Sequence, residues 1–171
     1  MHVFLTGASG FIGSHLQQAL QVAGHEVRAA TRSQGFDFGR MLTEADWYPH
    51  LSGMEVVINT VGIIAEVGDQ RFDAVHHLAP AALFRASMQA GVKRVIQVSA
   101  LGADEQAFTP YQLSKRAADE VLRDLPLDWF VLRPSLVYGR GGKSSALFHR
   151  MAALPCCLWS AMAGRGYSRC M

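Results

Sequence analysis

The stretch TGASGFIG, residues 6–13, decides how this sequence is interpreted. It places Gly7, Gly10 and Gly13 three residues apart, directly after the apolar run 3–6 and directly before an amphipathic run. A phosphate group needs backbone N–H donors aimed at it, and the N-terminus of a helix supplies free donors and a favourable dipole. A glycine-rich turn between a strand and a helix is therefore typical of a dinucleotide-binding site.

Each glycine of this turn has a separate expected role. Gly7 allows the tight turn out of the strand, Gly10 lets the backbone approach a pyrophosphate without an intervening Cβ, and Gly13 lets the helix lie close to the sheet. The alternative is a purely structural turn. On the first interpretation, the residues expected to bind the cofactor here are Gly7, Ser9, Gly10, Phe11, Ile12 and Gly13.

Length and composition indicate one globular domain. The 171 residues are 50% hydrophobic and 18% charged, and such a chain buries a substantial core. The net charge of +2 is too small to indicate nucleic acid or an anionic membrane as a partner. We find no apolar stretch of about 18 residues that would predict a membrane span. Met1 leads directly into the first strand, so we expect no secretory signal and a cytoplasmic location.

The three cysteines, Cys156, Cys157 and Cys170, all lie in the last 16 residues. Their spacing matches neither a zinc site nor a disulfide framework, so we expect free thiols and no metal. The composition also shifts here, which divides the chain into a domain at 1–155 and a tail at 156–171. The tail is either an aberrant or truncated end, or a short natural segment that covers the sheet or meets a partner.

Short apolar runs alternate with helical patterns along the chain. Strands are predicted at 3–6, 26–30, 55–60, 94–99 and 128–132, and helices from Ile12 to Gly24 and at 72–90 and 110–125. Between them we predict a short strand at 36–38, followed by a helix through Trp47. This alternation predicts a Rossmann-type α/β fold, a doubly wound parallel sheet in three layers, α/β/α.

The end of the second predicted strand bears on which dinucleotide is bound. An NAD-selective site usually has an acidic residue there, which binds the ribose 2′-hydroxyl. This chain has Thr31 and Arg32 instead, and a guanidinium can pair with the additional phosphate of NADP. We therefore favour NADP over NAD, with Arg28 as a second candidate. The alternative is that Arg32 is a solvated surface residue.

Tyr111 and Lys115 are four residues apart in YQLSK, so on a helix they share one face. A neighbouring ammonium lowers the pKa of a phenol, and the tyrosine can then exchange a proton with a carbonyl or alcohol. The alternative is an exposed tyrosine beside a surface lysine.

Four motifs occur in a familiar order: the glycine turn, Asn59 to Gly62 (NTVG), Tyr111 to Lys115, and RPSLVYG at 133–139. Together they resemble the short-chain dehydrogenase/reductase superfamily, in particular its extended and atypical branches, which include sugar-nucleotide epimerases and dehydratases. The stretches VSALGAD, YQLSKRAADE and LRPSLVYG are similar to the branch related to the NAD(P)H-binding accessory subunit of respiratory complex I.

The resemblance implies roles for individual residues. Tyr111 would be the acid/base, Lys115 would hold the nicotinamide ribose, and a serine would orient the substrate. Ser99 is the nearest serine, but the family's serine lies one or two residues further on. Ser99 either donates to the cofactor or substrate, or satisfies backbone at the strand end. The other residues given a role by the resemblance are Asp37 (adenine), Val61, Gly62 and Pro134 (cofactor), and Asn59 (sheet structure). His76 or His77 lies near where many relatives carry an asparagine, so one of them either serves as a neutral hydrogen-bonding group or, as we favour, both are exposed at the surface.

The resemblance implies two functions, of which we favour the first. The first is an NAD(P)-dependent oxidoreductase or nucleotide-sugar epimerase/dehydratase that uses a Tyr–Lys acid/base pair. The second is a non-catalytic NAD(P)H-binding module for assembly or redox sensing. Extended members of the superfamily carry a further substrate-binding domain. We expect this chain to lack the complete domain, so no substrate is predicted. The sequence does not give the oligomeric state; helices of this unit often form a dimer interface in the wider family, and the helix that begins near Pro110 is one candidate for a homodimer.

Overall fold

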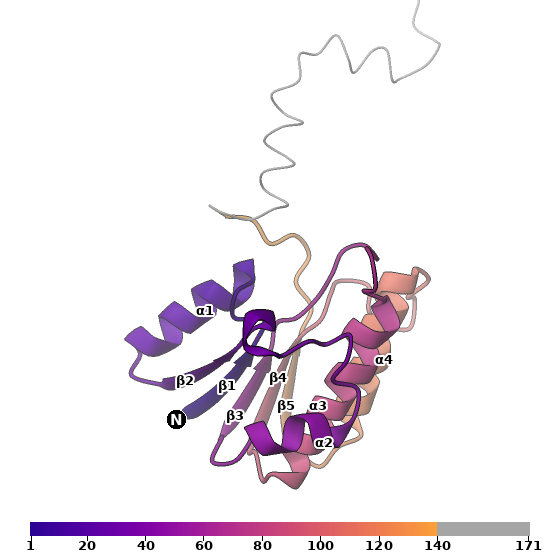
Figure 1. The fold of residues 1–171 in the computed structure, drawn as a ribbon. Coiled ribbons are helices and arrows are strands. Elements are labelled where there is room, and N and C mark those ends of the chain that lie inside the picture. Colours follow the sequence, from indigo (N-terminus) through magenta and orange to yellow (C-terminus); the bar gives the residue numbers. More distant parts are fainter. Residues whose placement is uncertain (140–171) are drawn as a thin grey trace, which may run out of the picture. The chain divides into compact units, whose positions relative to one another are not determined.

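The computed structural model describes residues 1–139 and forms an α/β fold around one parallel sheet (Figure 1). The strands are β1 (His2–Thr6), β2 (Glu26–Ala30), β3 (Val56–Asn59), β4 (Arg94–Val98) and β5 (Asp128–Leu132), in the order β2-β1-β3-β4-β5. The α-helices are α1 (Phe11–Val22), α2 (Glu44–Trp47), α3 (Ala79–Gln89) and α4 (Pro110–Arg123). All five predicted strands outside 36–38 are confirmed, and so is the Rossmann-type sheet.

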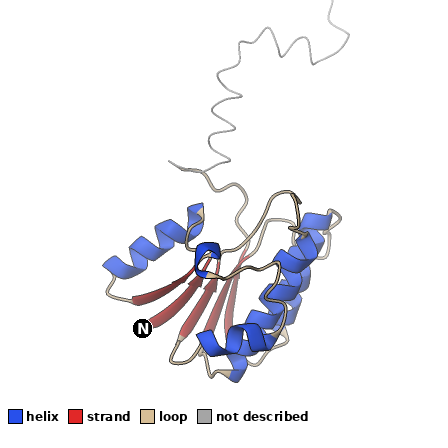
Figure 2. Cartoon of the chain, in the orientation of Figure 1, coloured by secondary structure: helices blue, strands red, loops and turns tan. Residues whose placement is uncertain are grey.

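Alternating side chains of the strands build two cores. Val3 and Leu5 of β1 pack on the face that α1 covers, together with Leu16 and Leu20 of that helix. Phe4 points to the opposite face, because successive side chains of a strand alternate. That face is covered by α2, α3 and α4, so the sheet is the middle of three layers (Figure 2).

The predicted strand at 36–38 is wrong. This segment is a loop, and Gly35 before it has a φ of +93° and ends a short 3-10 turn at Arg32–Gln34. Phe38 lies 4.9 Å from Trp47 between ring centroids, and Phe36 lies 5.6 Å from Phe4. The two aromatic side chains therefore anchor a loop to the core, and β2 is an edge strand of the sheet.

The predicted helix at 72–90 begins with a π-helical turn, η3 (Asp73–Leu78), before α3. Pro80 explains the change of geometry, because it has no N–H to donate to the carbonyl four residues earlier. The N–H of Ala79 instead reaches the carbonyl of Ala74. Such turns are frequent at functional sites, and this one carries His76.

The topology identifies one end of the sheet as the place for a ligand. The chain leaves β1 toward β2 on one side and returns to β3 on the other, so the strand order reverses between β1 and β3. Ligands of doubly wound folds bind outside the carboxyl ends of the strands at this switch point. The turn at residues 7–10 and the loops after β3 and β4 all lie at this edge (Figure 1).

Candidate functional site

The glycine turn is packed so closely that Gly7 and Gly13 leave no room for a side chain. Gly7 has a φ of +72°, and a Cβ there would lie 2.7 Å from Thr60 Oγ1. A Cβ on Gly13 would fall on the carbonyl oxygen of Gly7 and lie 2.9 Å from the Cα of Ala8. Gly13 therefore lets α1 lie close to the backbone that directly follows β1.

The N-terminus of α1 is open to an anion. Gly10 occupies the cap position, no side chain of the described residues caps the helix, and its first turn has no acidic residue. Ser9 and Gly10 are exposed, while Phe11 and Ile12 are half-buried. The free N–H groups and the helix dipole favour a phosphate at this position.

The end of β2 lies beside the glycine turn, because the N–H of Gly7 donates to the carbonyl of Ala30 at 3.1 Å. Thr31 is hydrogen-bonded to Gln34 through its hydroxyl at 2.8 Å. Arg32 is exposed, and its guanidinium contacts no acceptor within residues 1–139. Its charge is therefore available next to the turn.

The other two candidates near β2 are engaged locally. Arg28 donates to the carbonyl of His50 at 3.0 Å. Asp37 accepts from the N–H of Gly39 at 3.0 Å and lies 3.7 Å from the guanidinium of Arg40. Arg32 is thus the better placed of the two arginines.

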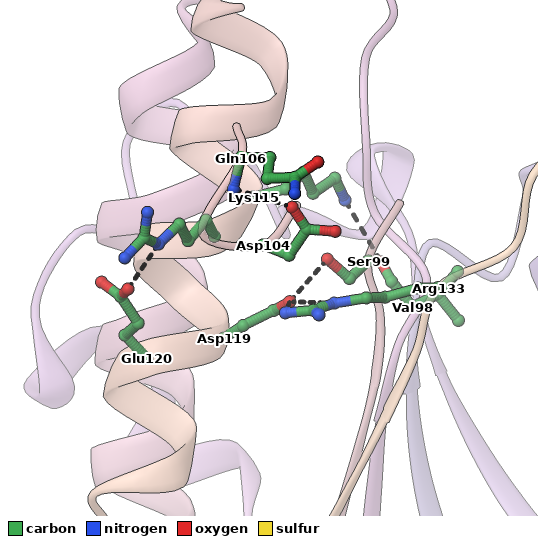
Figure 3. A network of polar contacts seen from close by, with 9 residues as sticks. Val98, Ser99, Asp104, Gln106, Lys115, Asp119, Glu120 and Arg133 are labelled. Atoms are coloured by element: carbon green, nitrogen blue, oxygen red, sulfur yellow. Dashed lines mark hydrogen bonds and ion pairs between the residues drawn. The ribbon is translucent and has the colours of Figure 1, made fainter. Parts of the chain in front are cut away.

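Lys115 is buried in α4 and joins the ends of two strands. Its Nζ donates to the carbonyl of Val61 at 3.1 Å and to that of Val98 at 3.2 Å, the latter drawn in Figure 3. Burial lowers the pKa of Lys115 to about 8, although Asp119 opposes the shift. A Cβ on Gly62 would lie 3.1 Å from this Nζ, so the glycine leaves room for the ammonium.

Tyr111 lies on the same face of α4, as the four-residue spacing predicted, and is half-buried. The expected lowering of its pKa is wrong: burial raises the pKa of the Tyr111 phenol. The Lys115 ammonium is held by two carbonyls, so it does not offset the desolvation of the phenol. Tyr111 stays protonated at neutral pH, as a proton donor must be.

His76 is fully buried, which contradicts the expectation of a surface histidine. Its Nε2 accepts from the N–H of Ile63 at 2.9 Å, and its Nδ1 lies 3.0 Å from Ser114 Oγ. That hydroxyl in turn donates to the carbonyl of Tyr111. The Nδ1 atom must therefore carry the proton. Burial, followed by the charge of Lys115, lowers the pKa of His76 to about 3, so the ring is neutral.

The hydroxyl of Ser99 points toward Asp119 (Figure 3). It donates to Asp119 Oδ2 at 2.8 Å, and Arg133 donates to the same oxygen at 3.1 and 3.3 Å. Burial raises the pKa of Asp119, while Ser99 and Arg133 lower it. This network ties β4, α4 and the end of β5 together. It also includes a site residue that the sequence analysis missed, although Asp119 follows Lys115 by four residues on the same helix face.

The remaining candidates hold the loops in place. Asn59 is buried, accepts from Thr6 and donates to Gln97 at 2.7 Å, which confirms its structural role. The carbonyl of Pro134 accepts from the N–H of Leu101 at 3.0 Å. Within residues 1–139, no three side chains form a group that could hold a metal, and no helix is both long and apolar enough to span a bilayer.

Residues 3–159 match the model of the NAD dependent epimerase/dehydratase family. The ceramide reductase of Caulobacter vibrioides is 30% identical over 88% of this chain and 51% of its own length. An uncharacterized sugar epimerase of Bacillus subtilis is 30% identical over 78% of this chain and 71% of its own. The mitochondrial NADH dehydrogenase 1 alpha subcomplex subunit 9 of Mus musculus is 28% identical over 78% of this chain and 40% of its own length. The chain thus spans about half the length of the ceramide reductase.

Two solved structures illustrate the shared fold. A short-chain dehydrogenase/reductase superfamily protein of Agrobacterium tumefaciens with bound NAD has a TM-score of 0.65 and 20% identity, over 78% of this chain and 48% of its own. A dTDP-4-dehydrorhamnose reductase of Bacillus anthracis in complex with NADP has a TM-score of 0.70 and 16% identity, over 90% and 61%. These two structures share the fold, and the family match over residues 3–159 together with the curated relatives confirms the expected resemblance. The chain belongs to the NAD dependent epimerase/dehydratase family.

Proposed function

We propose that this chain binds a nicotinamide dinucleotide along the carboxyl edge of the sheet, with the diphosphate against the N-terminus of α1. The close packing of Gly7 and Gly13 and the uncapped helix end support this position. Val61, Gly62 and Pro134 would lie toward the nicotinamide, because Val61 and Gly62 follow β3 and Pro134 follows β5 at the same edge of the sheet.

Arg32 supports a preference for NADP. Its exposed guanidinium lies directly after β2, where the 2′-phosphate of the adenine ribose would lie. A charge-assisted hydrogen bond there would favour NADP over NAD. Thr31 would assist at the same ribose, and Asp37 would lie toward the adenine.

We further propose that the bound dinucleotide serves a redox reaction at Tyr111. The nicotinamide supplies or accepts the hydride. When a carbonyl is reduced, its carbon gains that hydride and its oxygen gains the phenolic proton of Tyr111, which solvent then replaces. Lys115 has one N–H left beyond its two carbonyl partners, and this donor would hold the nicotinamide ribose. The buried Lys115 beside Tyr111 is the observation that carries this proposal.

One observation favours the second candidate function, a binding module without turnover. The Ser99 hydroxyl is bonded to Asp119, so it does not orient a substrate oxygen in this arrangement. The mouse relative is named as a subunit of NADH dehydrogenase, which suits a module for assembly or redox sensing. A cytoplasmic location and a homodimer through α4 stay predictions.

Calorimetry and turnover together test these proposals. NADPH and NADH are titrated into the full chain, and cofactor oxidation is then followed with a panel of carbonyl compounds. We expect tighter binding of NADPH, and turnover that Tyr111→Phe abolishes while binding persists. Binding without any turnover that depends on Tyr111 would support the module, and an absence of binding would overturn both functions.

A further inference from the structure

Four large apolar side chains are exposed on two loops at the carboxyl edge of the sheet. Ile64 and Val67, in the loop after β3, are 82% and 70% exposed. Leu101 and Phe108, in the loop after β4, are 64% and 80% exposed. Isolated exposed apolar residues are normal, but several on neighbouring loops indicate a surface that binds something apolar.

These loops flank the proposed reaction site. Lys115 Nζ bonds to the carbonyls of Val61 and Val98, which stand where the two loops begin. Both loops therefore leave the sheet beside the same ammonium. Phe108 precedes Tyr111 by three residues, and Thr109 between them caps α4. An apolar group held by these loops would thus lie next to the phenol.

The charge of the loops argues against an anionic substrate. Residues 60–70 and 99–109 contain four carboxylates and no lysine or arginine. The carboxylates are Glu66, Asp69, Asp104 and Glu105. Just beyond the first loop, the Arg71 guanidinium donates to the carbonyls of Gly68 and Gln70. A sugar nucleotide carries a diphosphate that needs cationic partners, and these loops would repel it.

We propose that the substrate is an uncharged carbonyl or alcohol borne on a long aliphatic chain. Ile64, Val67, Leu101 and Phe108 bind that chain and leave the polar end at Tyr111. The inference rests on the proposed function for the position of the reacting carbon. The apolar and acidic character of the loops is what selects the class of substrate.

The direct test measures binding as a function of chain length. In the presence of NADP⁺, 2-alkanones of increasing length compete with a fluorescent pyrenyl alcohol for the full chain. We expect affinity to rise about two- to fourfold per methylene, and UDP-glucose not to compete. Affinity that is independent of chain length, or displacement of the probe by UDP-glucose, would overturn the inference.

Paired variants test whether the two loops cause the dependence of affinity on chain length. Ile64→Ser combined with Phe108→Ser is expected to flatten the dependence on chain length. Val22→Ser is the matched control, because Val22 is 84% exposed at the far end of α1; an equal loss in this control would contradict the assignment. If the dependence on length holds but no ketone is reduced, only the redox function fails. If short ketones are reduced through Tyr111 without such dependence, only this inference fails.

Discussion

The rings of His76 and Tyr111 lie edge to face, with centroids 5.3 Å apart and planes at 89°. Phe72 stacks on the imidazole at 5.3 Å and also meets the ring of Tyr111 edge to face at 5.9 Å. His76 also accepts from the N–H of Ile63, so one buried ring positions both the phenol and the loop after β3. This arrangement makes His76 a positioning residue that acts through Tyr111.

Substitution of His76 is expected to change how stability depends on acid. Because its pKa is about 3 rather than 6.5, the unfolded chain binds more protons between these pH values. The wild-type free energy of unfolding should therefore fall from pH 6.5 downward, by up to about 1.4 kcal/mol per pH unit. His76→Asn should reduce this slope in urea unfolding at pH 7 and pH 5. His77→Asn is the control, because His77 is bonded near the surface to Asp73; equal slopes in both variants would contradict the assignment.

The pKa of Lys115 predicts a change in the free energy of unfolding at alkaline pH. Its pKa is about 8 in the folded chain and 10.5 ordinarily, so the unfolded state binds more protons between these values. Stability contributed by this group should rise from pH 8 toward 10.5. Lys115→Met should lack this rise, whereas Lys93→Met, at an exposed ion pair with Glu55, should retain it. Identical pH profiles of wild type and Lys115→Met would show that the ammonium is not buried.

The glycine turn predicts a difference between two similar substitutions. Gly13→Ala forces a Cβ onto the backbone of Gly7 and should lower the free energy of unfolding by about 3 kcal/mol. Gly10→Ala places a Cβ 3.1 Å from Gly7 O at a negative φ, so it should cost much less. Thermal or urea denaturation without cofactor measures both. Equal losses would contradict the packing of this turn.

Arg32 should discriminate between the two dinucleotides. Arg32→Ser removes the proposed partner of the 2′-phosphate and should weaken NADPH binding about 10- to 100-fold, with little effect on NADH. Arg40→Ser is the control, since Arg40 is paired with Asp37. Calorimetry with both nucleotides gives the result, and a parallel loss for NADH would refute the assignment.

Ser99 is expected to matter for stability more than for turnover. Ser99→Ala removes one of the donors to the buried carboxylate of Asp119 and should cost about 1–3 kcal/mol of unfolding free energy. Ser87→Ala, which removes a buried bond to a backbone carbonyl in α3, is the comparison. A fall in kcat of about 100-fold or more with unchanged stability would instead assign Ser99 to proton transfer or substrate orientation.

Local patterns predicted the strands and the glycine turn because their signals lie within a few neighbouring residues. The strand limits 26–30 and 128–132 were predicted as found. The prediction of a strand at 36–38 failed because aromatic packing against Trp47, which is a tertiary contact, overrides the strand-like composition of this segment.

Burial explains what the sequence analysis missed in the site. The spacing of Tyr111 and Lys115 predicted a shared helix face, but not the desolvation that raises the pKa of the phenol. The π-helical turn at Pro80 places His76 inside the fold, which no helical periodicity indicates. The bond from Ser99 to Asp119 joins residues 20 positions apart, a pairing that only the fold establishes.

Amide chemical shifts of the isotopically labelled full chain, recorded by NMR during titration with NADP⁺, show whether the diphosphate binds at the N-terminus of α1. We expect the largest early changes at the N–H groups of residues 9–13, where the diphosphate meets α1. If the chain is saturated with NADP⁺ and the amide shifts change only outside residues 9–13, this position of the diphosphate is contradicted. Amide shifts that change with neither NADP⁺ nor NAD⁺ would contradict it as well.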